Sequence, residues 1–486
     1  MDIKNLTIKK AHELLVNKKM SVLELANEVT KMAKESSDLN AYLELFSDVR
    51  AQAEVAQKMI DEGTATLMTG IPLAMKDNIL IKGKIASASS KMLENYVATY
   101  DAGVTKKLRE AGAIFIGRTN MDEFAMSGST ENSAFGVTKN PHDKTRVPGG
   151  SSGGSASALA SGACLGALGT DTGGSIRQPA SFCGVVGLKP TYGSVSRSGL
   201  ISMASSLDQA GPFAKTVEDA EIIFDCIKGH DPMDSTSESA DSRLGRNPNS
   251  FPRKAFKKPK VIGIPKEFVY AKGVDLSVLK NFEESIDQMK KAGYEIKEIS
   301  LPALAHGLAV YYILMPAEVS SNLARMDGVR YGYHRDGVNL LEDYMRSRGE
   351  GFGREVRRRI LLGTYVLSSG YYDAYYGRAC AVREMLKKDF EKAFEDVDII
   401  ATPTTPTPAF KIGEKSSDPL QMYLADIFTV PVNIVGVPAI SVPSGFASDG
   451  DAKLPLGIQF IAPHFGEDAL FAVGKDFEKV RGNANI

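Results

Sequence analysis

Two loops rich in glycine and serine, near the middle of the chain, constrain its structure and chemistry more than any other feature. The first loop runs over residues 149–155 (GGSSGGS) and the second over residues 171–175 (DTGGS). Glycine at this density costs backbone entropy and helix stability, so the backbone must turn sharply there or approach a ligand closely. The segment between the loops, 156–168, is almost entirely Ala, Ser, Gly and Leu. It predicts a helix packed very close to its neighbours.

The second loop places a serine hydroxyl among backbone N–H groups. The residues that follow, Ser175 to Pro179, predict the start of a helix. The unpaired N–H groups of such a turn can point at developing negative charge. Ser175 is therefore a candidate nucleophile, and the N–H groups of the Thr172-Gly173-Gly174-Ser175 turn are candidate oxyanion donors.

A serine nucleophile needs a base to accept its proton. None of the six histidines lies in or beside the two loops; a Ser-His-Asp triad stays open, because triads assemble in space, but nothing in the sequence favours it. Lys76 is the alternative, since it ends the short apolar run GIPLAMK, which predicts a buried strand. Desolvation would lower the pKa of this lysine and make its neutral amine a usable base.

Each of these features, taken alone, has a commoner explanation. A Gly/Ser loop is more often a flexible turn or a linker, and a lysine after an apolar strand usually lies on the surface. A phosphate-binding loop is a further alternative, but neither loop ends in the Gly-Lys-Ser/Thr that a P-loop requires. The combination and spacing of the three elements favour catalysis.

The motifs GGSSGGS and DTGGSIRQPA, with IPLAMKDNI upstream, resemble the amidase signature family. The likeness covers nearly the whole chain. Residues 117–136, 187–201 and 205–212 look like the branch of that family that works in tRNA-dependent amidotransferases.

The resemblance implies a role for each candidate residue. Ser175 would form the acyl ester, Ser151 would relay protons to Lys76, and Thr172, Gly173 and Gly174 would form the oxyanion hole. Residue types alone do not distinguish Ser151 from Ser152 or Ser155.

For glutamine as the substrate, the resemblance points to two charged groups. An arginine of the Arg357-Arg358-Arg359 triplet, with Arg358 and Arg359 as the candidates, would bind the α-carboxylate, and Asp426 would bind the α-ammonium. A bidentate guanidinium suits a carboxylate, which supports the assignment independently. A solvated helix face remains the alternative for all of them. Tyr311 and Tyr312 could line the pocket or lie in the core.

The resemblance also implies partners and a reaction. The chain would be the glutaminase subunit that supplies ammonia for converting Glu-tRNA(Gln) to Gln-tRNA(Gln), with the conversion of Asp-tRNA(Asn) to Asn-tRNA(Asn) left open as a second reaction. A B subunit would carry the kinase and tRNA-binding sites, and a small C subunit would hold the two together. ATP and magnesium are expected in the partner, because this chain shows no nucleotide-binding motif; no metal or cofactor is expected here.

Two alternative functions remain open. The first is a free-standing amidase acting on small or fatty amides. Gln178 and the two charged groups expected to bind glutamine, an arginine of the triplet and Asp426, argue against it. The second is a non-enzymatic scaffold subunit, which would not need Lys76, Ser151 and Ser175 together.

Composition limits the cellular setting. The formal net charge is −1, whereas a protein that grips a tRNA backbone alone usually carries a basic surplus, so a nucleic-acid role would belong to a partner. The four cysteines form no CxxC pair, which favours a reducing compartment. No signal peptide or membrane-spanning stretch is evident, so we expect a soluble, cytoplasmic protein.

The order of predicted elements indicates an α/β fold with a central mixed sheet covered by helices on both faces. Residues 1–65 read as helices, and residues 303–395 as a largely helical insertion over one core, so we expect a single domain over 1–486. The polar segment 231–259 reads as a surface loop. Helices are predicted after Ser21 and over 277–292. Strands are predicted over residues 70–76, 113–117, 185–188, 261–264, 294–301, 397–403, 439–442 and 456–460.

Overall fold

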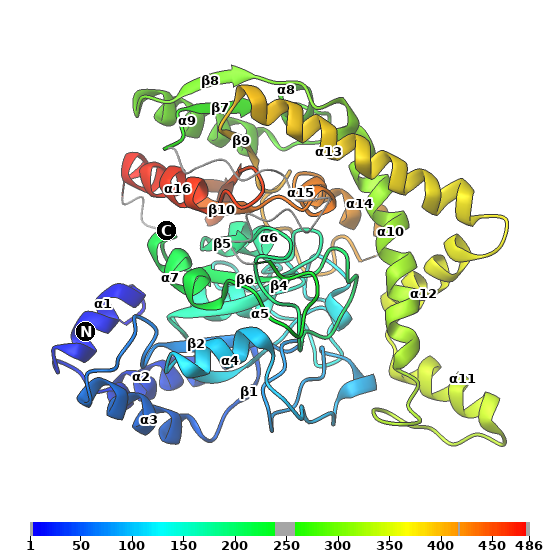
Figure 1. The fold of residues 1–486 in the computed structure, drawn as a ribbon, viewed down its shortest axis with the longest axis horizontal. Coiled ribbons are helices and arrows are strands. Elements are labelled where there is room, and N and C mark those ends of the chain that lie inside the picture. Colours follow the sequence, from blue (N-terminus) through cyan, green and yellow to red (C-terminus); the bar gives the residue numbers. More distant parts are fainter. Residues whose placement is uncertain (1–2, 239–257, 417, 483–486) are drawn as a thin grey trace.

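A single sheet of eleven strands runs through the computed structural model, which describes residues 3–238, 258–416 and 418–482 (Figure 1). The strand order is β1-β3-β2-β4-β6-β5-β10-β11-β9-β7-β8. Parallel pairs join β2 to β3 and β4, and join β7 to β8 and β9; the other pairs are antiparallel. The strands are β1 (Tyr42–Leu45), β2 (Pro72–Lys76), β3 (Ile114–Thr119), β4 (Gly166–Asp171), β5 (Val186–Lys189), β6 (Gln209–Ala214), β7 (Val261–Ile264), β8 (Glu295–Glu298), β9 (Ile399–Pro403), β10 (Ala439–Asp449) and β11 (Ala452–Ile461). The predicted mixed α/β sheet is confirmed.

Sixteen α-helices surround this sheet within the described ranges. They are α1 (Ile8–Val16), α2 (Val22–Glu35), α3 (Val49–Asp61), α4 (Gly103–Glu110), α5 (Gly153–Ala160), α6 (Arg177–Cys183), α7 (Val217–Ile227), α8 (Lys266–Val269), α9 (Leu276–Lys291), α10 (Gly307–Asn322), α11 (Leu340–Gly351), α12 (Arg354–Leu367), α13 (Arg378–Asp396), α14 (Pro419–Leu424), α15 (Val430–Val435) and α16 (Glu467–Arg481). The helix predicted after Ser21 is α2, which begins with a capping box formed by Ser21 and Glu24. The first 65 residues also contain β1, which the sequence did not predict.

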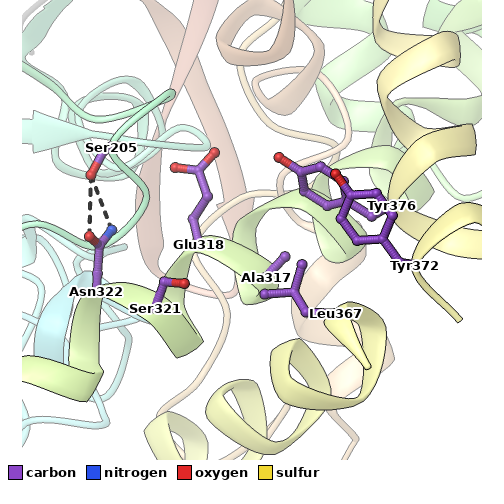
Figure 2. A pocket seen from close by; sticks show the side chains of 8 residues that line it. All are labelled: Ser205, Ala317, Glu318, Ser321, Asn322, Leu367, Tyr372 and Tyr376. Atoms are coloured by element: carbon purple, nitrogen blue, oxygen red, sulfur yellow. Dashed lines mark hydrogen bonds between the residues drawn. The ribbon is translucent and has the colours of Figure 1, made fainter. Parts of the chain in front are cut away.

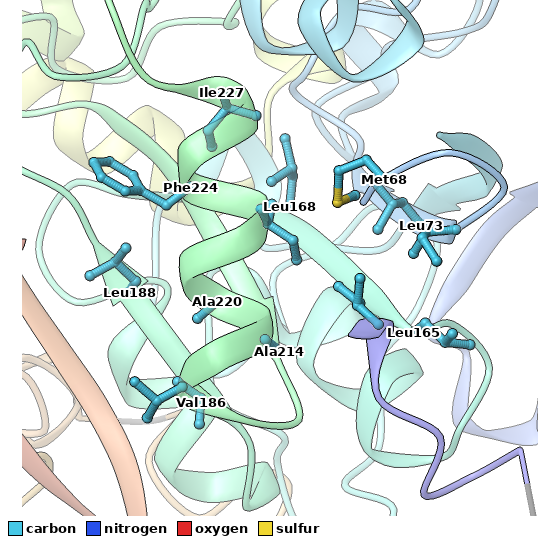
Figure 3. Packing of buried hydrophobic residues seen from close by; sticks show 14 of the residues in the cluster. Met68, Leu73, Leu165, Leu168, Val186, Leu188, Ala214, Ala220, Phe224 and Ile227 are labelled. Carbon is cyan, nitrogen blue, oxygen red and sulfur yellow. The ribbon is translucent and has the colours of Figure 1, made fainter. Parts of the chain in front are cut away.

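The two faces of the sheet bury different side chains, because neighbouring residues of a strand point to opposite sides. Leu73 of β2 and Leu168 of β4 pack with Phe224 of α7 on one face (Figure 3). Ala74 and Ala167, each next to one of those leucines, pack with the small residues of α5 and α6 on the other. Large side chains therefore separate α7 from the sheet, whereas alanines let α5 and α6 approach closely.

The segment between the two glycine loops is not one helix, so that prediction is wrong in its second half. Helix α5 ends at Ala160, Gly162 has a φ of +83°, and β4 begins at Gly166. Small residues carry no hydrophobic periodicity that would separate a helix from a buried strand. As a result, the second loop extends directly from a central strand.

The region 303–395 is largely helical, with α10 to α13 and a π-helical turn at Asp373–Gly377. It leaves the sheet after β8 and returns at β9, which both neighbour β7. Figure 1 shows α10, α11 and α12 along one side of the sheet. Most of the predicted polar loop 231–259 lies outside the described residues.

Candidate active site

Lys76 lies at the end of β2, where every residue of the strand is buried. Its Nζ atom is 2.8 Å from Ser151 Oγ, 2.8 Å from Thr170 Oγ1 and 3.4 Å from the Thr170 carbonyl oxygen. Burial lowers the pKa of Lys76 to about 7, against the opposing charges of nearby carboxylates. A neutral amine has two N–H groups and one lone pair. When Thr170 accepts both N–H groups, the lone pair faces the Ser151 hydroxyl.

The serines of the first loop have different partners. The Ser152 hydroxyl donates to the Thr170 carbonyl at 3.1 Å, and the Ser155 hydroxyl donates to the Leu168 carbonyl at 2.9 Å. Both therefore fasten α5 to β4. Among the serines of this loop, only Ser151 contacts the Lys76 amine in the described structure. The choice that residue types left open is thus made by geometry.

Two side chains and one backbone N–H group hold the first loop in place. Gln178 accepts the Gly150 N–H at 2.8 Å through Oε1 and donates to the Gly128 carbonyl at 2.7 Å through Nε2. The N–H of Asp122 donates to the Ser151 carbonyl at 3.2 Å, and the Thr130 hydroxyl donates to the Gly149 carbonyl at 2.8 Å. The peptide bond between Gly150 and Ser151 is cis.

The second loop is organised by a buried ion pair. Asp171 and Arg177 have fully buried side chains, and Arg177 Nη2 lies 2.9 Å from Asp171 Oδ1. Asp171 also accepts the N–H groups of Gly174 at 2.8 Å and Ile176 at 3.2 Å. Burial is the largest single influence and acts to raise the pKa of Asp171, but the charge and hydrogen bonds of Arg177, with the Lys189 charge and the Asn433 hydrogen bond, together outweigh it, and the pKa falls to about 2. The carboxylate therefore stays ionised and folds the turn around itself.

The backbone donors of this turn are not equivalent. Gly174 is not a free donor, because Asp171 Oδ1 already accepts its N–H. Among the described residues, the N–H groups of Thr172, Gly173 and Ser175 have no hydrogen-bond partner, and neither has the Ser175 hydroxyl. The Ser175 side chain is nearly buried, and its carbonyl accepts the Ser152 N–H at 3.3 Å. The two loops thus lie side by side, with three N–H groups and one hydroxyl unpaired.

Of the three consecutive arginines, only Arg359 is buried; Arg357 is exposed and Arg358 half-buried. Arg359 donates from Nε to Glu355 Oε1 at 2.8 Å, and its guanidinium lies 5.6 Å from the ring centres of Tyr312 and Tyr423. Arg358 pairs with the other oxygen of Glu355. Helix α12 therefore directs Arg359 inward and leaves Arg358 half-buried at the protein surface.

Asp426 follows α14 and carries a buried oxygen, Oδ1, that has no hydrogen-bond partner among the described residues. Burial raises the pKa of Asp426 to about 7; the charge of Asp171 acts in the same direction and Arg359 opposes it. A Cβ atom placed on Gly128 would lie 3.5 Å from Asp426 Oδ2, and one placed on Gly173 would lie 2.7 Å from the Tyr311 hydroxyl. Tyr311 thus borders the second loop, and Asp426 lies beside Gly128, whose carbonyl Gln178 ties to the first loop. The unpaired oxygen of Asp426 is suited to a cationic donor.

A separate pocket lies beside α10 (Figure 2). Its lining residues come from the loop before β6, from α10, from the end of α12 and from the region of the π-helical turn: Ser205, Ala317, Glu318, Ser321, Asn322, Leu367, Tyr372 and Tyr376. None of the predicted catalytic residues lines it. The candidate site is therefore the region around Lys76, Ser151 and Ser175.

The Amidase family model matches residues 24–471. The chain belongs to the amidase family. It is 50% identical over 482 residues to the A subunit of the glutamyl-tRNA(Gln) amidotransferase of Ruminiclostridium cellulolyticum, covering 98% of both chains. It is 52% identical over 482 residues to the A subunit of the same amidotransferase in Thermoanaerobacter pseudethanolicus, covering 99% of this chain and 97% of the relative. The crystal structure of the glutamyl-tRNA(Gln) amidotransferase A subunit from Thermotoga maritima is similar, with a TM-score of 0.78, 38% identity, and coverage of 99% of this chain and 95% of that one.

Sequence reasoning missed several residues of this amidase site. Thr170, Asp122 and the Asp171–Arg177 pair were not among the predictions. Asp171 and Arg177 flank the second loop in DTGGSIR, so a charge pair around a glycine turn was a signal that could have been used. Thr170 and Asp122 have no such signal, because they reach the site only through the pairing of β2 with β4 and the turn after β3. No described helix has the length and apolar run that crossing a membrane requires.

Proposed function

We propose that this amidase is the glutaminase subunit of a tRNA-dependent amidotransferase and that it hydrolyses glutamine through an acyl-enzyme. The observation that carries the proposal is the 2.8 Å contact between buried Lys76 and Ser151, beside the turn that holds Ser175. A lysine with a pKa of about 7 is neutral in much of the protein near neutral pH and can accept a proton. The names of the relatives, A subunits of a glutamyl-tRNA(Gln) amidotransferase, support membership of such a complex; glutamine as the amide donor is part of the proposal.

The reaction begins with two proton transfers. Ser151 gives its proton to the Lys76 amine and takes the proton of Ser175, whose oxygen attacks the amide carbon of glutamine. The N–H groups of Thr172, Gly173 and Ser175 stabilise the oxyanion, and each such donor contributes about 3 kcal/mol. The relay then returns a proton to the amide nitrogen, the C–N bond breaks and ammonia leaves. Water hydrolyses the ester by the same relay, releasing glutamate and free Ser175.

Two buried charges would recognise the two ends of the amino acid. Arg359 would bind the α-carboxylate, because Glu355 occupies its Nε while the one contact of Nη1 is a long 3.6 Å approach to the Met315 sulfur. Sulfur is a weak acceptor, so this edge of the guanidinium is available. Arg358, which is half-buried, would add positive charge near the α-carboxylate. Asp426 would accept the α-ammonium through its unpaired Oδ1.

The proposed complex needs further subunits. The names of the relatives designate each of them as one lettered subunit of an amidotransferase, which implies a multi-subunit enzyme. We propose a B subunit that binds tRNA, ATP and magnesium, and a small C subunit. Exposed apolar residues on and beside α11 and α12 support a protein partner: Val338, Leu340, Leu341, Met345, Leu361 and Tyr365.

The test is steady-state ammonia release from glutamine by the purified chain and by its Ser175→Ala and Lys76→Ala variants, with acetamide and benzamide as controls. We expect the parent chain to hydrolyse glutamine and both variants to lose this activity. Acetamide and benzamide should be turned over little. Fast hydrolysis of the controls without glutamine turnover would contradict the proposal and indicate a general amidase. If the chain alone is inactive on every amide, the same assay is repeated in the assembled complex, and the same two outcomes support or contradict the proposal there.

A further inference from the structure

Glu123 is a buried carboxylate that the proposed reaction does not use. It lies in the turn after β3, directly after Asp122, and only 3% of its surface is exposed. Its Oε1 accepts the Ser90 hydroxyl at 2.5 Å, and its Oε2 accepts the Gly353 N–H at 2.8 Å. Gly353 immediately precedes α12 and belongs to the short joint between α11 and α12. Glu123 therefore ties a loop of the core to the start of a helix more than two hundred residues away.

This contact replaces a cap that the helix lacks. Gly353 has no side chain with which to cap α12, and no side-chain cap is present at its N-terminus. A carboxylate near a helix N-terminus is favoured by the partial positive charge there. A Cβ atom on Gly353 would lie 2.3 Å from Glu123 Oε2, so the close approach requires glycine. Phe124 adds an edge-on contact to Phe352, with ring centres 5.6 Å apart.

The first turns of α12 carry the groups proposed to recognise glutamine. Glu355 lies two residues after Gly353, and its Oε1 accepts both Arg359 Nε at 2.8 Å and the Tyr423 hydroxyl at 3.1 Å. On the other side of Glu123, the N–H of Asp122 donates to the carbonyl of Ser151. The adjacent residues Asp122 and Glu123 thus connect the first glycine-serine loop and the start of α12 to the same turn.

We propose that Glu123 is a positioning residue for substrate recognition, which sets the distance between Arg359 and the catalytic loops by anchoring the start of α12. The inference rests on the proposed glutaminase function. It assigns Glu123 no contact with the substrate. Its loss should weaken the binding of the substrate carboxylate and leave the recognition of the amide end intact.

The experiment measures equilibrium binding in the full chain carrying Ser175→Ala, so that no turnover occurs. Two ligands are titrated calorimetrically: L-glutamine, and 4-aminobutanamide, which has the same amide and ammonium groups without the carboxylate. Glu123→Met removes both acceptor oxygens at similar volume, and Glu123→Gln keeps one oxygen for the Gly353 N–H. We expect Glu123→Met to raise the Kd for glutamine about tenfold, the scale of one hydrogen bond to a charged group. The Kd for 4-aminobutanamide should stay within about twofold, and Glu123→Gln should restore most of the glutamine affinity.

Asp219→Ala is the matched control, because Asp219 is another buried carboxylate that accepts the N–H at a helix start, that of Ile8 in α1. Figure 1 shows α1 on the opposite side of the view from α11 and α12. Asp219→Ala should lower the melting temperature without changing either Kd. If Glu123→Met does not fold, Glu123→Asp, too short to reach Gly353, takes its place with the same expectation. An unchanged Kd for glutamine, or an equal loss for both ligands, would overturn the inference. A Ser175→Ala parent that binds glutamine neither alone nor in the assembled complex would instead contradict the proposed function.

Discussion

Lys76 and Lys189 are both fully buried, and burial lowers the pKa of each to about 7. Their surroundings differ. Lys189 donates to a backbone carbonyl, that of Pro190, at 2.7 Å, whereas Lys76 faces the hydroxyls of Ser151 and Thr170. A carbonyl can only accept, but a serine hydroxyl can also give up its proton. At the scale of single residues, burial gives both lysines a usable amine, and the hydroxyl partner suits Lys76 and not Lys189 to the proposed role of base.

The pH dependence of turnover should report on Lys76. Its pKa is lowered from 10.5 to about 7, so the neutral amine that accepts a proton accumulates as the pH rises through 7. We therefore expect kcat for glutamine to rise tenfold per pH unit below about 7 and to level off above it. Lys76→Ala should lose this rise together with most of the activity. A pH profile that stays flat between 5 and 8 in the parent protein would contradict the assignment.

The neighbouring serines of the first loop offer a matched pair of variants. Ser151→Ala removes the hydroxyl that contacts Lys76, and we expect a loss in kcat of about 10²–10⁴-fold, typical of a proton-transfer group. Ser152→Ala removes two hydrogen bonds to the Thr170 backbone, a donated one to the carbonyl and a longer accepted one from the N–H, and should cost about 1 kcal/mol of stability. Steady-state kinetics and thermal unfolding of both variants check this. Equal losses of kcat in the two would show that the relay does not run through Ser151.

At the scale of elements, the strand–turn–helix unit of β4 and α6 is held by Arg177. Besides Asp171, its guanidinium donates to the Thr429 carbonyl at 3.0 Å, to Gln459 Oε1 at 2.6 Å and to Asn433 Oδ1 at 2.5 Å. These partners come from the segment before α15, from α15 and from β11. The arginine therefore connects the turn of Ser175 with the last third of the chain.

Removing this arginine should be costly. Arg177→Met would leave the Asp171 carboxylate buried without its counter-ion, which costs about 3–5 kcal/mol. The contribution of the pair should be complete above pH 3.8 and should be lost as the pH falls through about 2, because the folded pKa of Asp171 lies below its ordinary value. Urea unfolding measures both effects. Arg109→Met is the control, since its pair with Asp101 is partly exposed and should contribute less than about 1 kcal/mol. Similar losses in the two variants would contradict this account.

At the scale of the whole molecule, the order of strands brings distant segments to one site. Lys76 comes from β2, Ser175 from the turn after β4, and Asp426 from a segment that follows the helical region 303–395. That region also supplies Arg359, and its outer helices, α11 and α12, carry exposed apolar side chains (Figure 1). The part of the site proposed to recognise the substrate is thus continuous with a surface suited to a partner.

A charge on this surface should impair assembly without affecting the fold. Leu361 of α12 is 71% exposed, and Leu361→Arg should abolish co-purification with the proposed partner subunits while changing stability by less than about 0.5 kcal/mol. Val55→Arg is the control on α3, because Val55 is 64% exposed on a different helix. Co-expression followed by size-exclusion chromatography measures assembly. Undiminished complex formation by Leu361→Arg would place the partner elsewhere.

Much of the fold was predictable because apolar runs and caps are local signals. The strands at 70–76, 261–264 and 397–403 and the helix over 277–292 were found within a few residues of their ends. The segment 156–168 was not, since alanine and glycine fit both a close-packed helix and a central strand. Strand β1 was missed because its four residues are all partly buried and lack an alternating pattern.

The sequence by itself determined the chemical groups of the candidate site: two serine loops, a lysine after a buried strand, an arginine triplet and an aspartate. Only the tertiary structure decided which members act together. It brought Ser151 and not Ser152 to Lys76, turned Arg359 inward, engaged the Gly174 N–H with Asp171 and left Asp426 Oδ1 unpaired. The reason is physical. Residue types fix what a side chain can donate, accept or ionise, whereas direction, burial and the choice of partner depend on strand pairing and helix packing between segments hundreds of residues apart.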